Sequence, residues 1–476
     1  MARPLELIDT TRTHQADAQR GLEQGRLIPD ERPQGPIEAP ALPITVEDTG
    51  LSGKFLGYMV LKVIHVLGLE TSLAISAHLK VHQSVIDKLL NGLKQQAFVE
   101  ILGSIAANVP RLRYGLTSAG REIATGAVKQ CEYVGPAPVT LAAYQAQVAK
   151  QSISKERVAS QALAGSLSHL VIPKQLIRRL GPAVNSARAV LFYGPSGNGK
   201  TSISEAIGRA FTQQIYIPYC VEVDGQIIKV FDPTVHSPTA EEPGLIGDDS
   251  EAVSVFKRKD DPRWVKCRRP VLSVGGELTL DMLDLDFDPI SKYYEAPAQV
   301  KATGGVFIID DFGRQLVKPK DLLNRWIVPL EKRVDYLTVH TGKKFEMPFD
   351  QLVIFSTNIP PNELMDAAQL RRVKYKLRID PPQFSEYAKI FRRVCEEHAL
   401  EMPEGILSYL LNDFYPKTGS GCAAFHPIFI VEHAIATCRF EGMRPSLTLD
   451  LVKDALGNLY IHDQDGDLGC QTPAGV

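Results

Sequence analysis

A glycine-rich stretch between an apolar run and a helical run constrains this chain more than any other feature of its sequence. Residues 194–201 read GPSGNGKT and follow the apolar run AVLFY. This spacing matches the pattern G-x-x-x-x-G-K-[ST], in which glycines let backbone N–H groups turn toward phosphate oxygens at a helix N-terminus. We therefore expect a strand, a phosphate-binding loop and a helix, with Lys200 at the terminal phosphates and Thr201 on Mg²⁺. The residues expected to contact the nucleotide are Gly194, Pro195, Ser196, Gly197, Asn198, Gly199, Lys200, Thr201 and Ser202.

Length and composition indicate a globular protein of several domains. The chain has 476 residues, of which 44% are hydrophobic, and this length suits roughly two to four packed domains. No apolar run approaches the ~18 residues of a membrane span, and the first residues lack the apolar core of a signal peptide. We therefore expect a cytoplasmic protein without a membrane span.

Cysteine spacing and net charge argue against two further classes. The seven cysteines include no C-x-x-C pair, so neither a zinc site nor a disulfide framework is expected. The formal charge of −2 and the pI near 6.6 lack the basic excess typical of a nucleic-acid-binding domain. Any nucleic-acid contact would have to be local.

The N-terminal third predicts a tail followed by a small domain. Residues 1–43 contain several prolines and no sustained periodicity, which is typical of a flexible tail. Between residues 44 and 135, helical periodicity over 54–67, 72–79 and 82–97 is followed by two strand-like runs at 98–102 and 112–116. Three helices and a β-hairpin are similar to a winged-helix domain.

A winged helix commonly binds DNA through its third helix, but the charges here are sparse. The stretch 82–97 offers only Lys88 and Lys94 against Asp87. Residues 44–150 hold ten Lys and Arg against seven Asp and Glu, a thin footprint for phosphate contacts. A protein-docking or structural role is therefore favoured over a DNA reader, which stays open as the alternative.

A connector of residues 136–170 should join this domain to the next one. Prolines punctuate residues 133–139, and residues 141–161 read as a helix. The segment 171–181 is similar to the one that lies over the adenine in many P-loop ATPases, although ordinary helix packing would give the same spacing.

Two later strands end in polar side chains that suit nucleotide chemistry. Residues 304–311 read GGVFIIDD, a buried strand followed by two carboxylates. Asp310 would act on Mg²⁺ through its water shell, and Asp311 would be the general base for water. Residues 351–358 read QLVIFSTN, in which Asn358 could orient the attacking water.

Together these motifs resemble the AAA+ ATPase family over about residues 170–460. The resemblance makes residues 194–201 the Walker A motif, residues 306–311 the Walker B motif and Asn358 sensor 1. A helix expected over 320–332 and a hairpin within 334–347 are similar to the clade of MoxR-like ATPases and bacterial enhancer-binding activators, and the wording IDDFGRQLVKPKDLLNRWIVPLEKR is most similar to the MoxR-like group. The implied domains are a nucleotide-binding domain at 171–380, a helical lid at 381–460 and a tail at 461–476.

The resemblance also assigns roles to arginines. Arg371 and Arg372 stand where the family presents an arginine finger to a neighbouring subunit, which requires an oligomer; a salt bridge at a helix end is the alternative. The lid has His426 and Pro427 where the family often has a Ser-Pro-Arg sequence, so the sensor 2 role is empty or falls to another residue such as Arg439.

Extra residues separate the first two motifs. Residues 221–228 read as a hairpin on an Asp-Gly turn, and the acidic stretch 236–261 reads as a mobile loop. Either could face the pore of a ring, or both could be surface elaborations.

The prediction is an α/β protein with a P-loop AAA+ core, a C-terminal helical lid and an N-terminal winged-helix-like domain. We expect a slow ATPase that uses ATP and Mg²⁺, assembles into a ring, expected to be a hexamer, and remodels a protein client. The alternatives are a DNA-binding regulator or replication accessory switched by ATP, and a nucleotide-gated scaffold. The expected catalytic residues are Lys200, Asp310, Asp311, Asn358, Arg371 and Arg372, and the expected metal ligands are Thr201 and Asp310.

Overall fold

The computed structural model describes residues 35–106, 109–239, 259–419 and 421–459 of the chain. The described residues from Ile37 onward belong to one compact unit. Most of the expected N-terminal tail, most of the acidic 236–261 stretch and all of the C-terminal tail lie outside the described residues. None of the helices in the described ranges combines the length and the apolar character that a membrane span requires.

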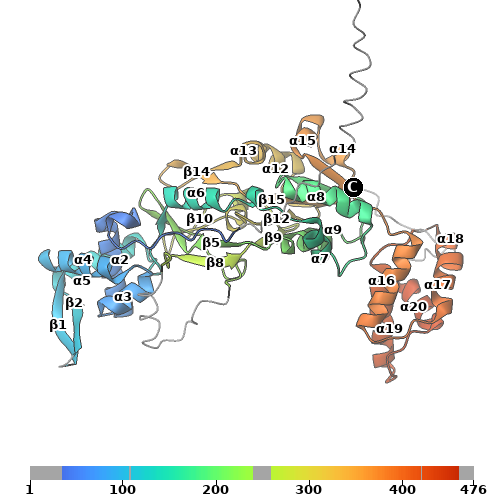
Figure 1. The fold of residues 1–476 in the computed structure, drawn as a ribbon, viewed down its shortest axis with the longest axis horizontal. Coiled ribbons are helices and arrows are strands. Elements are labelled where there is room, and N and C mark those ends of the chain that lie inside the picture. The colour runs from blue at the N-terminus through green and yellow to red at the C-terminus, as the bar shows by residue number, and fades with distance from the viewer. Residues whose placement is uncertain (1–34, 107–108, 240–258, 420, 460–476) are drawn as a thin grey trace, which may run out of the picture. The chain divides into compact units, whose positions relative to one another are not determined.

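A five-stranded parallel sheet forms the centre of the α/β region (Figure 1). Its strands lie in the order β16-β4-β15-β12-β9, and every neighbouring pair is parallel. The expected α/β fold class is therefore confirmed. The strand bounds are Val190–Tyr193 for β4, Val271–Val274 for β9, Val306–Ile309 for β12, Leu352–Thr357 for β15 and Tyr375–Arg378 for β16.

Alternation along the strands gives the sheet an apolar layer on each face. In β4, Val190 and Phe192 join a core with helices α8 (Lys174–Asn185) and α9 (Lys200–Arg209), whereas Leu191 joins a core on the other face. Successive side chains of a strand point to opposite faces, so an unbroken apolar run fits a strand covered on both sides. Packing on both faces holds the sheet in place, and with it the loops that follow its strands.

The helical run expected over residues 320–332 is wrong as a single helix. The structure has α12 (Pro319–Arg325) and α13 (Ile327–Lys332), with a break at Trp326. Pro329 has no N–H, and its ring would clash with the carbonyl of Arg325 in a continuous helix. The fully buried Trp326 side chain packs against Phe307 and Phe349 at this break.

A second sheet and two hairpins surround the parallel sheet. The second sheet has the order β10-β11-β7-β6-β3. Its β6–β7 turn has positive φ at Asp224 (54°) and Gly225 (77°), so the hairpin expected on an Asp-Gly turn is confirmed.

The hairpin expected within 334–347 is also present, as β13–β14. The bounds are Val139–Thr140 (β3), Cys220–Val223 (β6), Gln226–Lys229 (β7), Asp286–Phe287 (β10), Tyr294–Glu295 (β11), Val334–Thr338 (β13), Lys344–Pro348 (β14), and Gln214–Pro218 and Trp264–Arg268 for the paired β5 and β8.

The connector differs from the expected single helix over 141–161. Helix α6 (Leu141–Lys150) ends early, and a turn with a short 3-10 helix (Ile153–Lys155) precedes α7 (Ser160–Ser166). The carboxylate of Asp350 accepts hydrogen bonds from Ser152 Oγ at 2.8 Å and from the Ile153 N–H at 2.9 Å, which hold the turn on the core. Tertiary contacts therefore override the helical pattern.

The helices and the hairpin expected between residues 54 and 116 are present. Helices α2 (Gly53–Leu67), α3 (Ser72–Leu79) and α4 (Gln83–Gln95) precede the hairpin of β1 (Val99–Ala106) and β2 (Val109–Leu116), and α5 (Ser118–Gln130) follows. The end of the expected tail is not free, because the Leu42 N–H binds the Lys259 carbonyl and the Asp261 N–H binds the Pro40 carbonyl.

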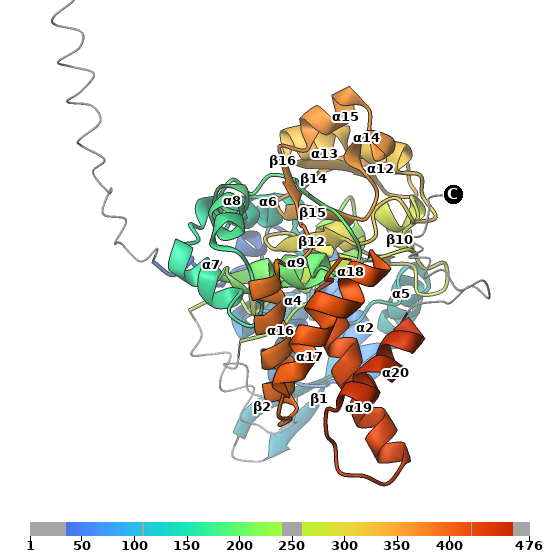
Figure 2. The same ribbon diagram turned by 90° about the vertical axis from the view of Figure 1, so that its right-hand side faces the viewer.

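Helices alone build the C-terminal region (Figure 2). They share one apolar core that includes Tyr387, Phe391, Ile430 and Val452. The α-helix that begins at Glu404 ends at Tyr409, and residues Leu410–Phe414 continue it as a π-helical turn. The bounds are Phe384–Glu397 (α16), Glu404–Tyr409 (α17), Tyr415–Thr418 (α18), His426–Phe440 (α19) and Leu449–Leu459 (α20); elsewhere α11 is Ala298–Lys301, α14 is Pro361–Leu364 and α15 is Ala367–Arg372.

Candidate functional site

The ends of three neighbouring parallel strands place the sequence motifs together. Residues 194–199 follow β4, Asp310 follows β12 and Asn358 follows β15. Since β4, β15 and β12 are adjacent and parallel, their carboxyl ends open at one edge of the sheet, where α/β proteins commonly bind ligands.

Two glycines of the loop have no room for a side chain. A Cβ on Gly194 would lie 2.3 Å from the carbonyl oxygen of Ile379, and one on Gly197 would lie 2.2 Å from the ring of Phe425. Both glycines also have φ values in the left-handed range, 140° and 74°. The loop runs directly into α9, whose first N–H groups have no partner within the helix.

Lys200 turns back over the loop. Its Nζ donates hydrogen bonds to the carbonyls of Gly194 at 3.0 Å and Pro195 at 2.9 Å. Burial lowers the pKa of Lys200, while the nearby carboxylates of Asp310 and Asp311 act to raise it. The site thus holds one buried ammonium group facing two carboxylates.

Thr201 and Asp310 are in direct contact. Thr201 Oγ1 donates a hydrogen bond to Asp310 Oδ2 at 2.7 Å. A hydroxyl and a carboxylate are the oxygen donors that Mg²⁺ uses beside substrate phosphates. The two residues therefore fit the metal that the sequence motifs imply.

Asp311 and Asn358 also meet. Asn358 Nδ2 donates to Asp311 Oδ1 at 3.4 Å. The backbone of Asp311 is left-handed, with φ 48°, a conformation that costs roughly 1–3 kcal/mol in a non-glycine residue and that clusters at functional sites. The side chain of Asp311 is exposed, so water can reach its carboxylate.

A contact from the helical region to the loop was missed at the sequence level. The Phe425 N–H donates to the Gly197 carbonyl at 3.0 Å, and the Ala424 N–H donates to Asn198 Oδ1 at 3.2 Å. Asn198 Nδ2 in turn lies within hydrogen-bond distance of the Pro195 and Ser196 carbonyls. The only available signal was the polar Asn inside the loop.

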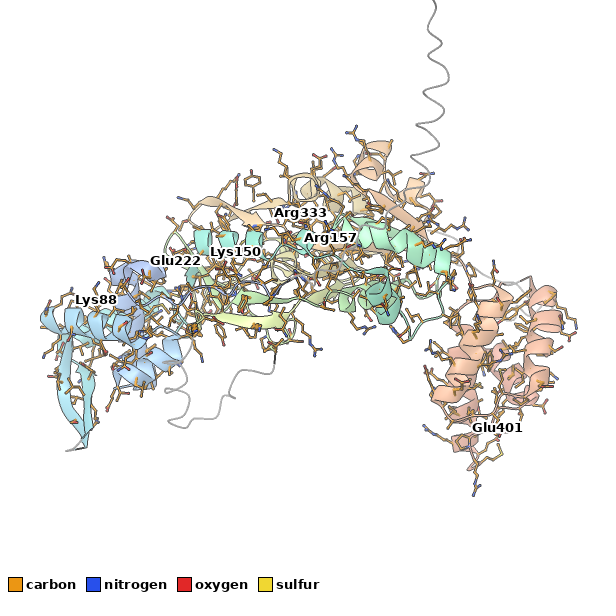
Figure 3. The ribbon with its side chains drawn as sticks, viewed as in Figure 1. Lys88, Lys150, Arg157, Glu222, Arg333 and Glu401 are labelled. Atoms are coloured by element: carbon orange, nitrogen blue, oxygen red, sulfur yellow. The ribbon has the colours of Figure 1, made fainter. Side chains whose placement is uncertain are left out.

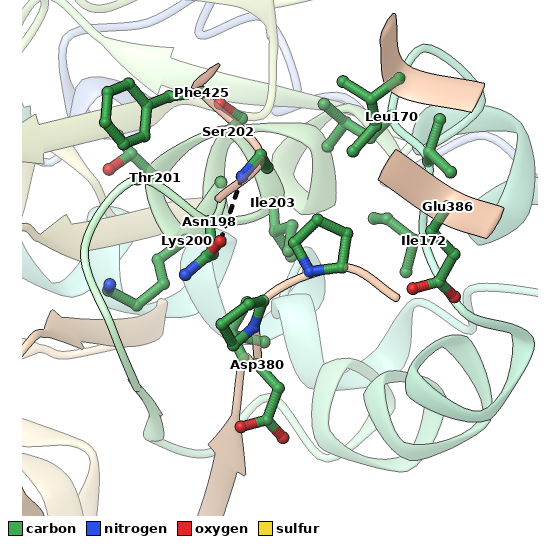
Figure 4. Close-up of a pocket in the computed structure, with 18 of the residues that line it drawn as sticks. Leu170, Ile172, Asn198, Lys200, Thr201, Ser202, Ile203, Asp380, Glu386 and Phe425 are labelled. Atoms are coloured by element: carbon green, nitrogen blue, oxygen red, sulfur yellow. Dashed lines mark hydrogen bonds between the residues drawn. The ribbon is translucent and has the colours of Figure 1, made fainter. Parts of the chain in front are cut away.

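These groups line a cavity of about 1100 Å³ (Figure 4). Lys200 lies on one side of it, and the apolar Leu170 and Ile172 lie on the other, in the segment before α8. An apolar wall opposite a phosphate-type loop suits a purine base. The cationic side chains that line this cavity are Lys174, Arg179, Lys200, Arg378 and Arg393.

The arginines for which the sequence suggested a catalytic or sensor role do not line the cavity. They are Arg371, Arg372 and Arg439. Arg372 Nε pairs with Glu331 Oε1 at 2.9 Å, the helix-end salt bridge that was the alternative reading of its role. Arg371 is exposed and makes no hydrogen bond or ion pair with the described residues. Arg439 is also exposed. Of the lid positions considered for sensor 2, His426 is buried and bonds to the Tyr415 hydroxyl.

The fold and the site together define an α/β protein with a glycine-rich loop between strand β4 and helix α9. A family profile described as a domain of unknown function (DUF8689) matches residues 383–458, which lie within the C-terminal helices. No curated protein sequence matches the chain.

Several solved structures are similar to parts of the chain, all at low identity and low TM-score. NtrX from Brucella abortus in complex with ATP has 13% identity over 65% of this chain and 58% of its own, with a TM-score of 0.35. The same protein in complex with ADP has 14% identity over 74% and 69%, with a TM-score of 0.38. Domain III of the replication initiation protein DnaA from Thermotoga maritima has 12% identity over 62% and 96%, with a TM-score of 0.34. At these values none of them assigns an activity to this chain, which spans somewhat over half of the ATP-bound NtrX chain.

Proposed function

We propose that this chain binds ATP with Mg²⁺ and hydrolyses it, as its resemblance to the AAA+ family implies. The observation that carries the proposal is the meeting of Lys200, the Thr201–Asp310 pair and the Asp311–Asn358 pair at one edge of a parallel sheet. Phosphoryl transfer to water requires a positive charge near the phosphates, oxygen ligands for a metal ion and a group that accepts a proton from the attacking water. These three roles match the residues at this edge of the sheet.

Lys200 supplies the positive charge for the phosphates. Its two present partners are neutral carbonyls, whereas an anionic phosphate oxygen would add charge–charge attraction to the hydrogen bond. Lys200 would therefore exchange the loop carbonyls for phosphate oxygens. Thr201 and Asp310 would hold Mg²⁺, which neutralises charge on the phosphates when it is bound.

Asp311 and Asn358 activate and orient the attacking water. Asp311 accepts the proton that water loses as its oxygen bonds to the γ-phosphorus and the bond to ADP breaks, and Asn358 orients that water beside the carboxylate. Aspartate is one methylene shorter than the glutamate that most relatives carry, so we expect slow turnover.

Asp311→Asn tests this assignment. We expect the substitution to lower kcat about 10²- to 10⁴-fold, since it removes the general base, and to leave ATP affinity intact. Asp281→Asn, which changes an exposed carboxylate outside the cavity, is the matched control. A rate that stays at the wild-type level would remove Asp311 from this role.

We further propose that the chain acts as a ring, expected to be a hexamer of the MoxR-like type, on a protein client. Exposed Arg371 is free to reach the γ-phosphate of a neighbouring subunit, whereas Arg372 is held by Glu331. The finger role is therefore proposed for Arg371.

The charges of the winged-helix-like region favour a protein client over DNA. Lys88 on α4, labelled in Figure 3, pairs with Glu47, and Arg113 pairs with Glu70. Lys62 is buried and donates to two backbone carbonyls. Cations already paired within the chain add little to phosphate binding. We expect no binding of duplex DNA in fluorescence anisotropy at 0.15 M salt; salt-dependent binding would favour the regulator instead.

A further inference from the structure

The turn after β12 is closed by a side chain that no motif assigns. Asp311 and Gly313 both have positive φ, 48° and 106°, and the chain reverses between them. The Arg314 N–H donates to the Asp311 carbonyl at 2.9 Å, which completes the turn. The conformation of Asp311 therefore depends on what holds residues 310–315 in place.

Gln315 spans this turn with both ends of its carboxamide. Its Nε2 donates to the Asp310 carbonyl at 2.7 Å, and its Oε1 accepts from the Gly313 N–H at 2.8 Å. Rotating the amide by 180° would set oxygen against oxygen and N–H against N–H, so only one orientation fits. The side chain thus clamps the residues on both sides of Asp311.

The opposite side of the turn is attached to β15. The Phe312 N–H donates to the Ser356 carbonyl at 2.6 Å, and Thr357 Oγ1 donates to the Phe312 carbonyl at 2.7 Å. These bonds fix Phe312 beside the strand that carries Asn358. On the N-terminal side of Asp311, the Asp311 N–H donates to Asp310 Oδ1 at 3.0 Å, and the carbonyl of the same peptide group is held by Gln315.

We propose that Gln315 is a positioning residue for Asp311, holding its left-handed backbone so that the short carboxylate faces Asn358. This inference rests on the proposed function, in which Asp311 is the general base. An aspartate reaches less far than a glutamate, so the direction of its Cα–Cβ bond decides where the carboxylate lies. A misplacement of about 1 Å can lower a rate roughly 10²-fold.

Gln315→Leu, which removes both hydrogen bonds, is the first test. We expect kcat for ATP hydrolysis to fall about 10- to 100-fold, with ATP affinity by calorimetry and the melting temperature close to wild type. Gln315→Ala, which removes the same two hydrogen bonds without adding a large apolar side chain, serves as the measured variant if the leucine protein does not fold. Leu316→Ala changes a 77% exposed side chain in the same loop and is the control.

A double-mutant cycle with Asp311→Asn shows whether Gln315 acts through Asp311. We expect Gln315→Leu to have no further effect on kcat in the Asp311→Asn protein, because there is no base left to position. An equal loss in both backgrounds, or no loss in the single variant, would overturn the inference. If Asp311→Asn itself leaves the rate unchanged, the assignment of Asp311 fails, which is a separate result.

Discussion

Thr201 Oγ1 donates a 2.7 Å hydrogen bond to Asp310 Oδ2, although the two residues are 109 positions apart in the chain. Thr201 lies in the first turn of helix α9, and Asp310 follows strand β12. The contact joins the phosphate-binding loop to the acidic strand end, and it defines where a divalent cation would be held.

Asp310→Asn should weaken Mg²⁺ binding. Because Asp310 would act on the metal through its water shell, we expect the Mg²⁺ concentration for half-maximal ATPase activity to rise about 10- to 100-fold. Titrating Mg²⁺ at saturating ATP measures this. Asp321→Asn, at an exposed position of α12, should leave the requirement unchanged. An unchanged requirement in Asp310→Asn would show that Asp310 does not serve the metal.

Arg371 and Arg372 should respond differently to substitution. Arg371→Ala should lower the ATPase rate about 10³-fold without loss of ATP binding, as removal of a trans arginine does. Arg372→Ala breaks the partly exposed pair with Glu331 and a 3.3 Å hydrogen bond to the Ala368 carbonyl, and should have a small effect. Mixing Arg371→Ala subunits with Asp311→Asn subunits should restore activity at shared interfaces. Co-assembled subunits that stay inactive would contradict the finger role.

A buried ion pair should contribute strongly to stability. Arg269 Nε donates to Glu156 Oε2 at 2.5 Å, and both side chains are at most 4% exposed. Glu156→Gln would leave the Arg269 charge buried without its counter-charge, which costs about 3–5 kcal/mol. Urea unfolding measures the loss. Glu47→Gln, which breaks the exposed pair with Lys88, is the control and should change stability little.

His426 should make stability depend on pH. Burial lowers its pKa from 6.5 to about 4, so the folded protein binds this proton less readily than the unfolded chain. The contribution of neutral His426 is complete above pH 6.5 and is lost as the pH falls through 4, for a total of about 3 kcal/mol. His426→Gln should flatten the difference in unfolding free energy between pH 7 and pH 4.5, whereas exposed His65→Gln should not. Equal pH dependence in both variants would contradict this account.

Much of the site could be predicted because its chemistry follows strand ends. An apolar run followed by GPSGNGKT, by Asp310 and Asp311, or by Asn358 is readable locally, and the parallel order of the strands then brings the ends together. The break at Trp326 could also be predicted from Pro329, since an interior proline removes a helix hydrogen bond and clashes with the carbonyl four residues earlier.

Other features depend on contacts that no local pattern encodes. The Ala424 N–H reaches Asn198 across 226 positions, and Arg372 meets Glu331 across 41. Gln315 lies only a few residues from Asp311, yet its proposed role depends on the left-handed backbone of Asp311, which the sequence does not predict. Such pairings become visible only when the packing of the elements is known.

The central claim is that residues 194–201 bind Mg-ATP through the charge of Lys200, and titration calorimetry tests it most directly. The 476-residue chain should bind ATP in the presence of Mg²⁺, and Lys200→Ala should lose tight binding because no ammonium group then contacts the β- and γ-phosphates. Lys320→Ala, at an exposed position of α12, should bind as the wild type does. Equal ATP affinity in the wild-type and Lys200→Ala proteins would contradict the account.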